Sequence, residues 1–126
     1  MCQEYGKIGE KNARMYTMQV LRALEYLHSE GVVHGDLKGA NVLVSQDGKE
    51  IKLCDMGNSL LLKAPSPGLV SDNAIQQQAS SRSLQSVNSL VYASPAWMAP
   101  ETHDSKIGKS SDIWSLGCLL VEMLTG

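Results

Sequence analysis

The chain has 126 residues, of which 43% are apolar, enough for one domain with a hydrophobic core. Its 11 basic and 13 acidic side chains give a net charge of −2, which argues against nucleic acid or an anionic membrane as a partner. The three cysteines lie far apart, so a disulfide framework or a zinc site is not expected and a reducing compartment is favoured. The polar N-terminal segment lacks the apolar stretch of a signal peptide, and we expect a soluble cytoplasmic protein.

The first predicted element is an amphipathic helix from Lys11 to Glu30, followed by Gly31, which is suited to the left-handed conformation that ends many helices. A β-hairpin comes next, with strands at 42–44 and 51–54 and a turn at Asp47-Gly48. Two strands alone are not stable, so the hairpin must pack on another element. The helix prediction depends on apolar residues at steps of three and four: Ala13, Tyr16, Val20, Leu24 and Leu27.

Residues 63–90 differ from the rest of the chain in composition. Two prolines, Pro65 and Pro67, interrupt regular structure, and a polar, low-complexity tract begins at Gln76. The segment offers too little apolar surface to offset the entropy of ordering it. Loops longer than about 12–15 residues are usually functional or disordered. We therefore expect a disordered insertion over 63–90.

The last predicted element is a helix that runs to Leu124. Ser110 or Ser111 is placed to cap its N-terminus. The sequence after the cap is apolar almost all round the helix, which predicts a position at the centre of a helical core. Trp97 and Trp114 are also expected to be core residues.

Four polar residues around the hairpin indicate a catalytic site. Asp36, Lys38 and Asn41 lie in the loop before the first strand, and Asp55 follows the second strand. Because a hairpin returns its second strand beside its first, Asp55 is expected close to Asn41. Two neighbouring oxygen donors suit Mg²⁺, a nearby lysine can pair with phosphate, and Asp36, left free of the metal, can accept a hydroxyl proton. The pattern indicates phosphoryl transfer, in which positioning and charge stabilisation do most of the work.

Four motifs resemble those of the eukaryotic protein kinases. The stretch HGDLKGAN at 34–41 resembles the catalytic loop H-R-D-L-x-x-x-N, and DMG at 55–57 resembles D-F-G. APE at 99–101 matches A-P-E, and SDIWSLG at 111–117 is similar to the start of the family's central helix. The motifs follow the family order, with a long insertion between D-M-G and A-P-E. The sequence at 38–41, and that leading into A-P-E, are most similar to the MAP kinase kinase kinase group.

The resemblance implies an α+β, mostly α fold: part of a protein-kinase-like C-lobe with a short β-hairpin at the catalytic loop. It implies a serine/threonine kinase of a MAP kinase cascade that uses ATP and Mg²⁺ to phosphorylate protein Ser or Thr hydroxyls. Asp36 would be the catalytic base, and Lys38 would neutralise the transferring phosphoryl group. Asn41 and Asp55 would hold Mg²⁺, and Leu43 would form the floor under the adenine.

Four further positions receive supporting roles from the resemblance. Ser94 matches the residue that contacts the catalytic loop and favours hydroxyl-amino-acid substrates. Asp112 would bond the catalytic-loop backbone from the central helix, and His34 would have a structural role. Glu101 would lack the arginine that usually buries with it, because the helices after the central one are absent.

Taken singly, most of these residues also have plainer explanations. Leu43 is expected in the core under either interpretation, so it discriminates nothing. The four motifs together, in the order that the family has them, favour catalysis, whereas no single residue does. The plainer alternatives are a packed core histidine for His34, a loop residue for Asp36, a solvated charge for Lys38, turn formers for Asn41, Asp55 and Ser94, and a first-turn helix acid for Asp112.

The departures from the family pattern are also informative. The sequence has no glycine-rich loop and no V-A-I-K lysine, so residues 1–126 are expected to be a kinase fragment that lacks the N-lobe and is inactive alone. A non-catalytic pseudokinase or kinase remnant, acting as an interaction module, is the alternative. Gly35 replaces the arginine of H-R-D, which pairs with a phosphate on the activation segment, and glycine cannot make that pair. Met56 replaces the phenylalanine of D-F-G, a change that we expect to be tolerated.

Overall fold

The computed structural model describes residues 6–62, 94–104 and 107–126. The insertion predicted at 63–90 lies outside these residues. Within these residues, short 3₁₀ turns connect two helices and two small antiparallel sheets. The elements in chain order are α2 Glu10–Ser29, β1 Val32–Val33, η1 Gly39–Asn41, β2 Val42–Val44, β3 Ile51–Leu53, η2 Met56–Asn58, β4 Leu60–Leu61, η4 Pro95–Trp97, η5 Pro100–Asp104 and α4 Lys109–Thr125.

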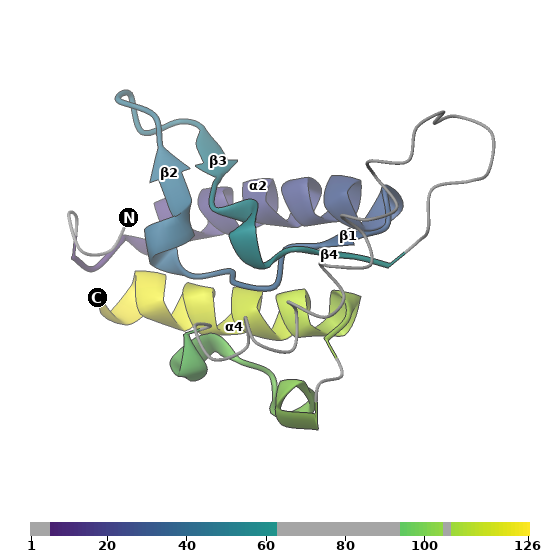
Figure 1. The fold of residues 1–126 in the computed structure, drawn as a ribbon. Helices are drawn as coiled ribbons and strands as arrows, with labels where there is room; N and C mark the ends of the chain where they lie inside the picture. Colours follow the sequence, from purple (N-terminus) through teal and green to yellow (C-terminus); the bar gives the residue numbers. More distant parts are fainter. Residues whose placement is uncertain (1–5, 63–93, 105–106) are drawn as a thin grey trace.

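Helices α2 and α4 pack side by side and run in opposite directions, with the small sheets along one side of the pair (Figure 1). The Ile8 N–H donates to the Met123 carbonyl at 2.7 Å, which ties the segment before α2 to the end of α4. Between the helices lies one hydrophobic cluster, formed by Ile8, Ala13, Tyr16, Val20, Leu24, Leu37, Val42, Leu116, Leu119 and Met123. The catalytic-loop segment is thus anchored to the core through Leu37 and Val42.

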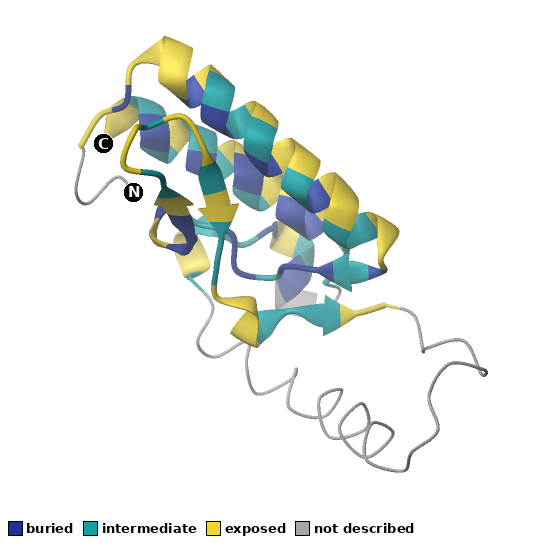
Figure 2. Ribbon diagram, turned by 90° about the horizontal axis from the view of Figure 1, so that it is seen from above, coloured by how far each residue is buried: buried dark blue, intermediate teal, exposed yellow. Residues whose placement is uncertain are grey.

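The predicted first helix is confirmed as α2, within one residue at each end. Four of the five apolar residues that predicted it are buried, and the buried positions lie on a different side of the helix from the exposed ones (Figure 2). Gly31 has φ +76°, the left-handed conformation expected just after the helix. A one-sided apolar stripe therefore sets both the existence and the orientation of α2.

The predicted hairpin is confirmed as β2 and β3, which pair in antiparallel register with Leu43 opposite Lys52. It packs on α2, as a two-stranded hairpin must. The Tyr16 hydroxyl donates to the Gly48 carbonyl at 2.8 Å, and Gln19 Oε1 accepts from the Ile51 N–H at 3.0 Å. Polar side chains of α2 thus hold the hairpin turn and the start of β3 in place.

Strands β1 and β4 form a second antiparallel pair that the sequence did not predict. Val33 faces Leu60, and the Leu62 N–H donates to the Gly31 carbonyl at 2.7 Å. Each strand has only two residues, too few for a period-of-two pattern to show in the sequence. The pair joins the start of the catalytic loop to the segment that follows D-M-G.

Two predictions about α4 are wrong. Gly108 rather than Ser110 or Ser111 is the N-cap, and Ser111 instead accepts a hydrogen bond from the Gly108 N–H at 3.2 Å through its hydroxyl. The helix is also not buried all round, because Trp114 is 50% exposed and Val121 is 61% exposed. Trp97, which lies before α4 and was also predicted to be a core residue, is only half-buried. Apolar composition alone could not show which side of α4 faces the core.

In the described part of the chain, neither α2 nor α4 combines the length and hydropathy that crossing a bilayer requires.

The packing of α2 leads to a stability prediction. Leu24 is 1% exposed in the core, whereas Leu21 on the same helix is 36% exposed. We expect Leu24→Ala to lower the free energy of unfolding by about 2–5 kcal/mol, through lost apolar burial and the cavity left behind. Leu21→Ala is the control and should cost less than about 1 kcal/mol. Urea unfolding measures both, and equal losses would contradict the assigned core.

Candidate active site

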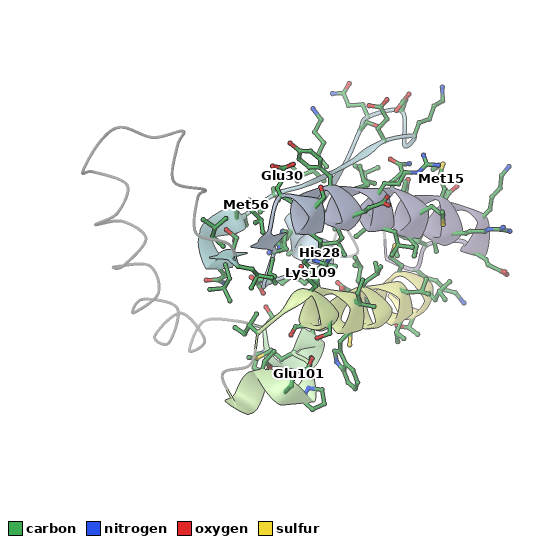
Figure 3. All side chains as sticks on the ribbon, turned by 90° about the vertical axis from the view of Figure 1, so that its right-hand side faces the viewer. Met15, His28, Glu30, Met56, Glu101 and Lys109 are labelled. Carbon is green, nitrogen blue, oxygen red and sulfur yellow. The ribbon has the colours of Figure 1, made fainter. Side chains whose placement is uncertain are left out.

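The catalytic loop is anchored by a buried carboxylate on α4. Asp112 is 1% exposed, and its two oxygens accept the backbone N–H groups of His34 and Gly35, each at 2.9 Å. The His28 ring on α2 donates to the same carboxylate at 2.7 Å, and Figure 3 shows His28 on the side of α2 that faces α4. One side chain therefore holds together the two helices and the start of the loop.

The His34 side chain fixes the loop from within. It is fully buried, its Nδ1 accepts the Asp36 N–H at 3.3 Å, and its Nε2 donates to the Cys54 carbonyl at 3.2 Å. These two contacts require a neutral ring with the proton on Nε2. The histidine therefore links the backbone of Asp36 to the end of β3, directly before Asp55.

Asp36, Lys38, Asn41 and Ser94 meet at one point. The Lys38 ammonium lies 2.8 Å from Asp36 Oδ2 and 2.8 Å from the Ser94 hydroxyl. The Asn41 amide nitrogen donates to the Asp36 carbonyl at 2.7 Å and to Asp36 Oδ2 at 3.2 Å. Asp36 and Asn41 are buried, at 7% and 5% exposure. The structure thus brings a carboxylate, an ammonium, an amide and a hydroxyl together at one site.

Asp55 lies beside this cluster but is exposed. The Cys54 N–H donates to the Asn41 carbonyl at 3.0 Å, so the backbones that carry Asn41 and Asp55 are adjacent. Asp55 has φ +62° and ψ +68°, and among the described residues it alone combines a positive φ with a side chain. Such strained conformations cluster at functional sites, which makes Asp55 a candidate for one.

The oxygen donors of Asn41 and Asp55 fit Mg²⁺ in kind. Both hydrogen bonds of the Asn41 side chain are donated by Nδ2, so its Oδ1 is available to a cation. Asp55 Oδ1 accepts only a long bond from the Gly57 N–H, at 3.4 Å. Residues 6–62, 94–104 and 107–126 hold no cluster of three histidine, cysteine or acidic ligands. A two-donor protein site suits Mg²⁺, which usually takes its remaining ligands from water and phosphate.

Leu43 corrects one expectation. It was predicted to be a core residue under either interpretation, but it is 56% exposed on β2. The alternation along the strand explains this, because Val42 faces the core and Leu43 therefore faces away from it. A large exposed aliphatic side chain close to Asn41 is a surface on which a flat apolar group can rest.

The comparisons with known proteins agree with these motifs. The sequence matches the family described as "Protein kinase domain" over residues 1–126. The chain belongs to the protein kinase family. The predicted fold class, a mostly helical part of a kinase C-lobe with a short hairpin, is confirmed by this match together with the observed elements.

The curated relatives point to a group within the kinases. The chain is 40% identical over its whole length to "Cell division control protein 7" of Schizosaccharomyces pombe and spans 10% of that protein. It is 38% identical over 96% of its length to "Mitogen-activated protein kinase kinase kinase 17" of Arabidopsis thaliana, spanning 27% of that protein. The same identity and coverage hold for "Mitogen-activated protein kinase kinase kinase 3" of Mus musculus, of which the chain spans 17%.

Sequence reasoning missed two residues that support the kinase loop, His28 and Glu122. Glu122 Oε2 accepts the Gly39 N–H at 3.0 Å and the Trp97 indole N–H at 2.9 Å. Each could have been found from the pattern of apolar residues around it in the sequence. His28 continues the apolar stripe of α2 four residues after Leu24, and Glu122 is an acid within the long apolar run of α4.

Glu101 lies at the beginning of η5, close to the N-terminal end of α4 (Figure 3). It is half-buried, and its Oε1 accepts long hydrogen bonds from the Ser110 and Ser111 hydroxyls, both at 3.4 Å. The Glu101 carboxylate, which the sequence predicts to lack its usual arginine, therefore has two hydroxyl partners in the described residues.

The anchoring role of Asp112 generates a second prediction. Asp112→Ala removes the acceptor of the His34, Gly35 and His28 N–H groups, so we expect the free energy of unfolding to fall by about 3 kcal/mol. Asp112→Asn keeps one oxygen acceptor and should cost clearly less. Glu25→Ala, at an exposed site on α2, is the control and should stay within about 0.5 kcal/mol of wild type. Urea unfolding that shows no difference between Asp112→Ala and the control would contradict the role.

Proposed function

We propose that this chain is the C-lobe part of a serine/threonine protein kinase, and that the activity belongs to a protein that carries the rest of the kinase domain. The observation that carries the proposal is the contact of Lys38 with both Asp36 and Ser94, at 2.8 Å each. The Lys38 ammonium lies between Asp36, the candidate base, and the Ser94 hydroxyl. In this position it can stabilise a phosphoryl group that is transferred to an acceptor hydroxyl.

In the proposed mechanism, Asp36 accepts the proton of the attacking hydroxyl. Its carboxylate is held by Asn41 and Lys38, and its backbone N–H by His34, so it is oriented before substrate arrives. The Lys38 ammonium stabilises the negative charge of the transferring phosphoryl group. Asn41 and Asp55 would hold Mg²⁺, whose positive charge would neutralise the nucleotide phosphates.

The substrate class follows from the same contacts. Ser94 lies against Lys38, at the position that the family resemblance links to hydroxyl-amino-acid substrates, so protein Ser or Thr is the proposed acceptor. ATP is the proposed donor, with its adenine resting on Leu43. A role in a MAP kinase cascade in the cytoplasm is proposed from relatives named as mitogen-activated protein kinase kinase kinases.

The alternative is a non-catalytic pseudokinase or kinase remnant that acts as an interaction module. It is motivated by Gly35 in place of the family arginine and by the lack of a glycine-rich loop in this sequence. The presence of Asp36, Lys38, Asn41 and Asp55 together argues against a long-decayed site. The transcript upstream of Met1 discriminates the two: an in-frame glycine-rich loop and lysine-bearing strand favour the enzyme, and a stop codon favours the remnant.

The third prediction tests the base. In the protein that carries the complete kinase domain, Asp36→Asn should lower kcat about 100- to 10,000-fold, because an amide cannot accept the hydroxyl proton. Asp47→Asn, an exposed carboxylate in the hairpin turn, is the matched control and should leave kcat unchanged. Phosphate transfer from labelled ATP to a serine-containing protein substrate measures both. Full activity of Asp36→Asn would overturn the proposed mechanism.

A further inference from the structure

Helix α4 holds Trp97 at two points. The Ser115 hydroxyl donates to the Trp97 carbonyl at 2.7 Å, and the Trp97 indole N–H donates to Glu122 Oε2 at 2.9 Å. Ser115 and Glu122 lie about two helical turns apart, so both project from the same side of α4. Trp97 is the last residue of η4, which packs against α4 (Figure 1). The position of η4 is therefore set by α4 through both the backbone and the side chain of Trp97.

The Glu122 oxygen that accepts the indole also reaches the catalytic loop. Oε2 accepts the Gly39 N–H at 3.0 Å, and Gly39 is buried directly after Lys38. The Glu122 side chain is itself half-buried. Hydrogen bonds to a carboxylate are roughly twice as strong as those between neutral groups, and burial strengthens them further. A single oxygen of Glu122 thus forms a strong bridge between η4 and the loop.

The loop and η4 are joined at a second point as well. The Lys38 ammonium donates to the Ser94 hydroxyl at 2.8 Å, and Ser94 is the N-cap of η4. The Trp97 N–H donates to the Ser94 carbonyl at 3.1 Å, so the two ends of η4 are tied to each other. One contact would let η4 pivot on the loop, whereas contacts at both of its ends fix its orientation. Loss of the bridge at Glu122 would therefore loosen the contact of Ser94 with Lys38.

We propose that Glu122 is a positioning residue for the acceptor side of the site: its carboxylate fixes η4 on the catalytic loop and so holds the segment that receives the protein substrate at a constant distance from Asp36. Glu122 acts through Trp97 and Gly39 rather than on the substrate itself. The bridge is a contact within this chain, whereas its consequence for the substrate rests on the proposed function.

The nucleotide side of the site has supports of its own. The Asn41 N–H donates to the Lys38 carbonyl at 3.0 Å, and the Asn41 amide nitrogen donates to the Asp36 carbonyl at 2.7 Å. The Cys54 N–H donates to the Asn41 carbonyl at 3.0 Å. These bonds do not include Glu122, so loss of the bridge should weaken the binding of the protein substrate and leave that of ATP nearly unchanged.

The bridge can be tested by hydrogen exchange of the two tryptophan indoles in the 126-residue chain. In Glu122→Ala, the Trp97 indole N–H should exchange with solvent about tenfold faster, because it loses its acceptor. The indole of Trp114, which is 50% exposed on α4, is the internal control and should be unaffected. Glu25→Ala, at an exposed site on α2, is the control variant and should change neither indole. Equal Trp97 exchange in Glu122→Ala and wild type would overturn the proposal.

The consequence for the substrate can be measured in the protein that carries the complete kinase domain. Glu122→Ala should raise the KM for a serine-containing protein substrate about tenfold and change the KM for ATP less than about twofold. Trp97→Phe removes the indole donor and should raise the same KM, with little further effect in combination with Glu122→Ala. Glu122→Gln keeps an oxygen acceptor and should restore most of the wild-type KM. Trp114→Phe is the matched control and should leave both KM values unchanged.

The outcomes separate the possible failures. If Glu122→Ala does not fold, the wild-type chain still decides the matter, because Trp97 exchange as fast as that of Trp114 would contradict the bridge. A KM for ATP that rises as much as that for the protein substrate would refute the positioning role. Faster indole exchange with an unchanged KM for the protein substrate would refute the link to the substrate. An inactive wild type, with faster exchange in Glu122→Ala, would refute the proposed function instead.

Discussion

The arrangement of the site depends on one buried carboxylate, that of Asp112. Burying an unpaired carboxylate costs several kcal/mol, so it is tolerated only with full hydrogen bonding. The three donors come from two separate elements: the ring of His28 on α2 and the backbone of His34 and Gly35 in the loop. The helix pair and the loop therefore have one relative position in which this charge is satisfied, which gives the loop a defined conformation although it contains little regular structure.

The position of the functional groups follows from this anchor. His34, held at its N–H by Asp112, uses its ring to reach the Asp36 backbone and the Cys54 carbonyl. The backbone of Asp36, the proposed base, and the residue before Asp55 are thus held by the same imidazole. Exposed groups remain where a ligand must reach them: Asp55 and Leu43 are solvent-accessible, whereas Asp36 is nearly buried. The proposed base, Asp36, and one proposed metal ligand, Asn41, are buried and hydrogen-bonded, which fits a preorganised site, whereas the other proposed ligand-facing groups are exposed.

Elements with a clear period could be predicted from the sequence, and contacts across the fold could not. The stripe from Ala13 to Leu24 predicted α2 to within one residue, and Asp47-Gly48 predicted the hairpin. The β1–β4 pair was missed because its strands are shorter than one detectable period. The sequence did not predict the Gly108 N-cap, because serine is itself a favoured N-cap residue. Here the Ser111 hydroxyl lies three residues later, inside the helix, and accepts a hydrogen bond from the Gly108 N–H. Chemical motifs predicted a set of candidate site residues, whereas the contacts of His28 and Glu122 depend on the packing of the two helices.

Gly35 shows how a departure from a family motif can be read in physical terms. From sequence alone, glycine at this position is a loss, since it cannot pair with a phosphate on the activation segment. In the fold, Gly35 has φ +79°, and its backbone N–H donates to the buried carboxylate of Asp112 at 2.9 Å. A side-chain pair with phosphate orders the activation segment only after modification, whereas a backbone contact is present at all times. The conformation of the loop at Gly35 therefore follows from the Asp112 anchor and needs no phosphorylated partner.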